Sequence, residues 1–274
     1  MDNPIRKKET GTMRIYLALA ALMLGGAVVA QNATATLAGT YQIGHPGSSG
    51  VNAAEMMAYD NTVTFTGQAY AAGNAGIDAQ NANNTITQMV FDDIFCTPGS
   101  AGLSTSHFYL TTWNNNAVAE QVRMRIRFWQ MDGAGGGPGT FITGYSTGLV
   151  TLNAGAANIW NLTIGAIPLW ADNFWAGIAF DNNAGGSPIT AAELNNVGQL
   201  IFDPPAVGTS NDVFYQSNIT SAFFGTNNPP GGNHWFGGSP HANFGWAFPV
   251  VPEPGTLAVL ATGLVGLFFR RVRK

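Results

Sequence analysis

The sequence predicts an all-β fold, an antiparallel β-sandwich of jelly-roll type, flanked by an N-terminal signal helix and a short C-terminal transmembrane helix. Between residues 36 and 250, short alternations of apolar and polar residues recur, with Gly, Asn, Asp or Pro breaks about every ten residues. No window there keeps a helical period, apart from a short turn at residues 190–195. Many short strands without intervening helices are typical of sandwiches and barrels.

The N-terminal segment, residues 1–35, has the pattern of a cleavable signal peptide. A basic stretch precedes an apolar run at residues 15–29, which is shorter than the roughly 20 residues that span a bilayer. Small residues then allow cleavage after Ala30 or after Ala35, and Met13 offers an alternative start. A retained anchor helix is the other interpretation.

The domain at residues 36–250 contains ten expected strands. They span residues 62–66, 86–95, 106–113, 121–131, 140–152, 158–164, 174–180, 197–202, 213–216 and 244–248. Their alternation is short and their breaks are frequent, as in sheets with one buried and one polar face.

The clearest alternation covers residues 120–129. Period-2 geometry puts four apolar side chains on the core face and three arginines on the opposite face. The apolar residues are Val122, Met124, Ile126 and Phe128, and the arginines are Arg123, Arg125 and Arg127. A Gly-rich turn beginning at Asp132 returns the chain into residue 140, which predicts a hairpin.

Charge is scarce and unevenly distributed. Charged residues make up 9% of the chain, and between residues 31 and 250 three arginines stand against twelve acidic residues, a formal balance of −9. Nucleic acid is therefore excluded as a partner, since its binding depends on Lys and Arg. The arginine row could bind an anionic polysaccharide, but with twelve acidic residues available, pairing with acids on adjacent strands is the favoured interpretation.

Two further sets of residues suggest binding. Asp92, Asp93 and Asp181 are weak candidates for a structural calcium site, although turn-forming Asp and Asn explain them equally well; no other cofactor is expected. Trp235, in a Gly-rich loop, is the best candidate for an exposed residue that stacks on sugars. The other tryptophans neighbour apolar strand residues and are expected in the core.

Two residues could carry nucleophilic chemistry. Ser146 lies in a G-x-S-x-G pattern, but the segment after it has the pattern of a strand, whereas a nucleophile elbow needs a helix there. Cys96 is the only cysteine, so no intrachain disulfide can form, and its apolar neighbours predict burial.

The strongest motif lies in the C-terminal tail, residues 251–274. Two prolines hold it extended, an apolar stretch follows at residues 256–269, and a basic stop-transfer cluster ends the chain. The motif residues are Val251, Pro252, Glu253, Pro254 and Gly255, and the basic residues are Arg270, Arg271, Arg273 and Lys274.

This tail resembles the PEP-CTERM sorting signal over its full length. The resemblance implies processing by an exosortase, a membrane transpeptidase-like protease of Gram-negative bacteria that make exopolysaccharide. It also implies export, transient anchoring in the inner membrane through the tail, and then a place at the cell surface or outside the cell.

We therefore expect a non-enzymatic surface or extracellular-matrix protein, associated with exopolysaccharide or biofilm. The alternative is a carbohydrate-binding module with a specific glycan ligand. A secreted hydrolase is the third hypothesis.

Overall fold

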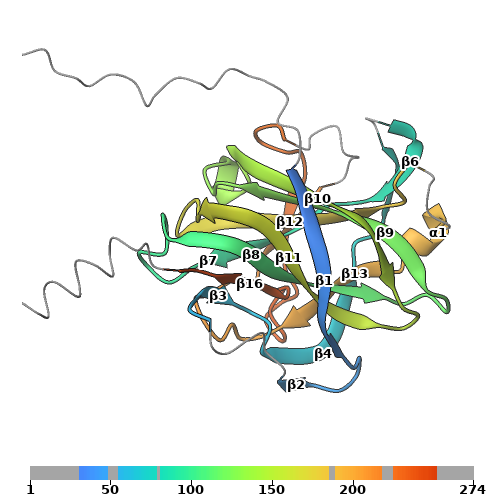
Figure 1. Cartoon of the computed structure of the whole chain (residues 1–274), viewed down its shortest axis with the longest axis horizontal. Coiled ribbons are helices and arrows are strands. Elements are labelled where there is room, and N and C mark those ends of the chain that lie inside the picture. The colour runs from blue at the N-terminus through green and yellow to red at the C-terminus, as the bar shows by residue number, and fades with distance from the viewer. Residues whose placement is uncertain (1–30, 49–54, 79–80, 185–188, 218–224, 252–274) are drawn as a thin grey trace, which may run out of the picture.

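The computed structural model describes residues 31–48, 55–78, 81–184, 189–217 and 225–251, and their regular secondary structure consists almost only of strands (Figure 1). The all-β prediction is confirmed. A short α-helix, α1 (Ala191–Leu194), occurs where the sequence predicted a turn, and Thr190 and Glu193 form a capping box at its start. Within the described ranges, no helix is long and apolar enough to span a membrane. The signal segment up to residue 30 and the tail from residue 252 lie outside them.

The strands form one curled, mixed sheet with two halves. The first half has the order β15-β14-β7-β12-β9-β10, and β6 pairs with both β12 and β5. The bounds are β5 (Asn74–Asp78), β6 (Asn81–Thr87), β7 (Val90–Phe95), β9 (Glu120–Trp129), β10 (Phe141–Leu152), β12 (Asn173–Asp181), β14 (Phe214–Gln216) and β15 (Gly232–His234).

The second half has the order β11-β8-β13-β4-β2, and β16 pairs with both β8 and β3. The bounds are β2 (Gly47–Ser48), β3 (Met57–Asp60), β4 (Thr64–Ala71), β8 (Ser104–Asn114), β11 (Ala157–Pro168), β13 (Val197–Phe202) and β16 (Trp246–Pro249).

Strand β1 (Gln31–Tyr41) joins the two halves. Its first three residues pair with Tyr145 to Thr147 of β10, and the remainder pairs with β11 (Figure 1). The β1–β10 pairing is parallel, so the expectation of a purely antiparallel sheet is wrong at this place. The physical reason is that β1 enters between β10 and β11, which run antiparallel to each other on its two sides and cannot both oppose it.

The two halves share one hydrophobic core. Phe128 of β9 and Phe108 of β8 meet edge to face with centroids 5.5 Å apart, and Phe128 lies 6.2 Å from Trp246 of β16. All four apolar residues expected on the inner face of β9 are fully buried in this core. The hairpin from β9 to β10 is also confirmed, and Asp132 holds its turn by accepting from the backbone N–H and the hydroxyl of Thr140.

Most expected strands occur within a few residues of their predicted limits. The segment at residues 86–95 divides into the end of β6 and the whole of β7. Strands β1, β2, β3, β5 and β15 were not predicted. The outer face of the first half is covered by a second apolar cluster around Phe91, Trp129 and Trp175.

Candidate functional site

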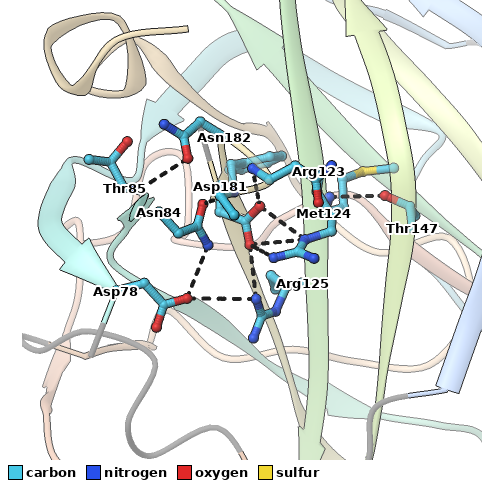
Figure 2. A network of polar contacts seen from close by, with 12 residues as sticks. Asp78, Asn84, Thr85, Arg123, Met124, Arg125, Thr147, Asp181 and Asn182 are labelled. Atoms are coloured by element: carbon cyan, nitrogen blue, oxygen red, sulfur yellow. Dashed lines mark hydrogen bonds and ion pairs between the residues drawn. The ribbon is translucent and has the colours of Figure 1, made fainter. Parts of the chain in front are cut away.

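The arginine row lies on the outer face of β9, and two of its members pair with acids (Figure 2). Arg123 Nε lies 3.0 Å from Asp181 Oδ1, and Arg123 Nη2 lies 2.8 Å from Asp181 Oδ2. Arg125 Nη1 donates to the same Oδ2 at 3.0 Å and lies 3.8 Å from Asp78 Oδ2. The expected pairing with acidic residues of neighbouring strands is therefore confirmed for Arg123 and Arg125.

Arg127 is held differently. Its Nη1 donates to the backbone oxygens of Ile126 at 2.7 Å and Tyr145 at 2.6 Å. Burial, and then the charges of Arg125 and Arg123, lower the pKa of Arg127 to about 9. Arg123 has the more exposed side chain of the two paired arginines, at 24%, so a glycan contact by this row stays a prediction that depends mainly on Arg123.

The weak calcium candidates do not lie together. Asp181 belongs to the arginine network on β12, whereas Asp92 on β7 pairs in register with Ala176, five residues earlier on β12. In the part of the chain that the structure describes, no group of three or more His, Cys, Asp or Glu side chains could hold a metal ion. Structural calcium at Asp92 or Asp93 stays a prediction.

Asp92 and Asp93 form a buried acidic pair with hydroxyl and amide partners. Asp92 Oδ2 accepts from the N–H of Phe244 at 2.9 Å, and Asp93 accepts from the Ser210 hydroxyl and the Asn211 amide, both at 2.7 Å. Burial and the neighbouring Asp93 charge raise the pKa of Asp92 well above its usual range. Burial raises the pKa of Asp93 to about 6.

Trp235 follows the edge strand β15 and is 68% exposed, the exposure expected of it. Its neighbour Phe236 packs against Phe214 and Tyr70, with ring centroids 5.4 and 5.7 Å apart. The carboxylate of Asp212 accepts from the backbone N–H groups of three loop residues at 2.8 to 3.2 Å. These residues are Phe236, Gly237 and Ala242. The loop is thus fixed to the body while Trp235 projects from it.

The other tryptophans pack in or against the hydrophobic cores. Trp129, Trp160, Trp175 and Trp246 are buried, and Trp113 and Trp170 are half-buried against the cores. Trp235 is therefore the most exposed tryptophan in the described ranges.

Of the two candidate nucleophiles, one lies within a strand and the other directly follows one. Ser146 is within β10, where its backbone is in register with Asn32 and Arg125, and the strand continues to Leu152. Cys96 is 7% exposed, which confirms its predicted burial, and burial raises its pKa to about 12. A thiol with such a pKa is a poor nucleophile.

A pocket that no sequence pattern predicted lies where the body ends. Six of the lining residues are Glu55, Met56, Ser106, His107, Val250 and Val251, and we call this pocket, of about 310 Å³, the exit pocket. His107 Nε2 lies 3.3 Å from Glu55 Oε2, and the Tyr109 hydroxyl donates to the same carboxylate at 3.4 Å. Glu55 and His107 come from distant parts of the sequence, so no local spacing could have predicted their contact.

Comparison with known protein families identifies one segment of the chain. The family model described as the PEP-CTERM protein-sorting motif matches residues 250–274. No curated protein and no solved structure matches the chain. The chain is thus an exported protein with a C-terminal membrane-anchoring tail of the kind that an exosortase processes, and the match begins at Val250, inside the folded body.

Proposed function

We propose that this PEP-CTERM protein is a non-enzymatic surface or extracellular-matrix protein, whose body associates with exopolysaccharide through the Trp235 loop. The observation that carries the proposal is the exposed indole of Trp235, on a loop fixed by Asp212. A loop whose backbone is already fixed loses little entropy when a ligand stacks on its exposed ring.

The charge of the body favours one class of glycan. With a formal balance of −9 between residues 31 and 250, the body repels an anionic polymer at long range. Two of the three arginines that could offset this repulsion are paired with Asp181. A neutral polysaccharide is therefore the preferred partner, with the sugar face on the Trp235 ring.

The proposal includes a membrane-spanning tail before processing and a sandwich arrangement of the body. Before processing, the apolar stretch at residues 256–269 would cross the inner membrane, with the basic end inside the cell. The antiparallel pairs on both sides of a shared core support a jelly-roll-like sandwich.

The test is affinity electrophoresis of the mature protein in gels that contain a neutral glucan, a neutral galactomannan or anionic alginate. We expect retardation by a neutral polymer, and Trp235→Ala weakens binding by about tenfold, since an aromatic contact contributes about 1.4 kcal/mol. Val118→Ala is the matched control, because Val118 is also exposed, at 55%. Equal retardation of wild type and Trp235→Ala would contradict the proposal.

The same gels separate the two other hypotheses. Strong preference for a single glycan would favour a carbohydrate-binding module with a defined ligand. A secreted hydrolase predicts esterase turnover that disappears in Ser146→Ala; the strand position of Ser146 makes us expect no turnover in either protein.

A further inference from the structure

The chain leaves the folded body with no linker before the sorting motif. The N–H of Val251 donates to the Ser104 oxygen at 2.7 Å, and the N–H of Ser104 donates back to the Val251 oxygen at 3.2 Å. The N–H of Val250 donates to the Met56 oxygen at 2.8 Å. Pro252 follows directly, so the backbone is held in the sheet through Val251, the first residue of the motif.

The exit pocket lies beside this last paired residue. Its rim is apolar where Met56 is 47% exposed and Val251 is 62% exposed. The His107–Glu55 pair supplies its polar part, with side chains 20% and 28% exposed. Met is a flexible side chain that adapts to varied partner surfaces. A pocket with an exposed apolar rim and one polar pair has the composition of a protein contact.

We propose that the exit pocket is the surface by which the folded body contacts the exosortase during processing. An extended chain advances about 3.3–3.6 Å per residue, so the three residues Pro252 to Pro254 reach at most about 11 Å from Val251. An enzyme that grips this segment therefore meets the rim of the exit pocket. The proposal rests on the exosortase part of the function above and is independent of glycan binding.

The contact has a physical role in processing. Because Val250 and Val251 are paired in the sheet, the enzyme cannot use them as a free extended substrate without breaking their hydrogen bonds. Contacts to Met56 and to the His107–Glu55 pair instead let the enzyme bind the motif while Val250 and Val251 keep their hydrogen bonds to the body. Such contacts also orient the motif, as binding energy away from the reacting bond does in other enzymes.

The test follows conversion of full-length precursor to mature protein in the producing bacterium, by pulse-chase and immunoblot. We expect Met56→Glu to slow conversion at least fivefold, because a carboxylate would be buried against an apolar contact. The control is Val118→Glu, which changes an exposed apolar residue beyond the far end of β8. That end of β8 lies about 33 Å from Ser104 along the strand. We expect this variant to be converted at the wild-type rate. Protease resistance of both variants checks that the body is folded.

A second experiment distinguishes a body surface that helps the exosortase to bind the motif from one that only hinders its access. An eight-residue Gly-Ser insertion between Val251 and Pro252 detaches the motif from the exit pocket. We expect the insertion to slow conversion and to remove the difference between wild type and Met56→Glu. Faster conversion with the insertion, or Met56→Glu converting at the wild-type rate, would overturn the proposal. Wild-type precursor that is never cut would refute exosortase processing itself.

Discussion

The guanidinium of Arg123 on β9 grips the carboxylate of Asp181 on β12 through two donors, at 2.8 to 3.1 Å. Asp181 is fully buried and also accepts from Arg125, so two of the three basic side chains in the body share one carboxylate, and Asp78 lies 3.8 Å from Arg125 as a second acid. This network fixes β9 beside β12 on the outer face of the first half-sheet.

Replacing Asp181 with Asn should destabilise the body by about 3–5 kcal/mol, because Arg123 would lose its buried counter-charge and Arg125 would keep only Asp78, at 3.8 Å. Urea unfolding measures the loss. Arg123→Lys is the matched conservative variant, since it keeps the charge but loses the two-donor geometry, and its loss should be smaller. An Asp181→Asn protein within about 1 kcal/mol of wild type, the value of a surface pair, would show that the network contributes little.

The acidic pair Asp92–Asp93 should make the protein less stable as pH rises. Burial raises the folded-state pKa of Asp93 to about 6, above the unfolded value. Its contribution to stability is therefore fully present below about pH 4 and is lost as pH rises through about 6, on the order of 2–3 kcal/mol. Asp92 acts in the same direction, because its pKa is also raised.

The measurement is the urea midpoint of wild type and Asp93→Asn between pH 4 and pH 8. The wild-type midpoint should fall across this range, and the variant should show a flatter curve. Asp172→Asn is the control: backbone N–H groups of Ala101 and Gly99 lower the pKa of Asp172, so its carboxyl titrates below this window. A wild-type midpoint that rises with pH would contradict the predicted direction.

The signal peptide should be cut after Ala30 and not after Ala35. Strand β1 begins at Gln31, and its first three residues supply the parallel pairing with β10 that joins the two half-sheets. Ala33 is 6% exposed and belongs to the central core. Mass spectrometry of the mature N-terminus should find Gln31, as glutamine or in its cyclised form. A mature chain beginning at Thr36 would contradict this prediction.

The sequence predicted the elements in which one face is buried and the other polar. Residues 121–128 alternate strictly, and β9 extends one residue beyond them at each end. Strand β1 was missed because its small residues directly follow the apolar run of the predicted signal peptide and resemble a cleavage region. Strand β7 was joined to β6 because Val90–Phe95 is buried along almost its whole length, and such a run lacks alternation.

The sequence predicted the candidate site that depends on a single exposed residue, but it did not identify the contacts between residues that are distant in the sequence. The exposure of Trp235 followed from its Gly-rich loop. The sequence predicted that arginines would pair with acids, but the choice of Asp181 depends on the order β12-β9, which no local pattern contains. The exit pocket combines residues near positions 55, 106 and 250, which only the folded sheet brings together.

The central claim is that the chain is an exported precursor whose sorting tail is removed by an exosortase. Mass spectrometry of the surface-exposed protein, digested with several proteases, tests it most directly. We expect peptides that cover the body up to the neighbourhood of Pro252, and no peptide from Thr256 onward. Recovery of the intact end from Arg270 to Lys274 on the surface-exposed form would contradict the claim, because the tail would then be a permanent anchor.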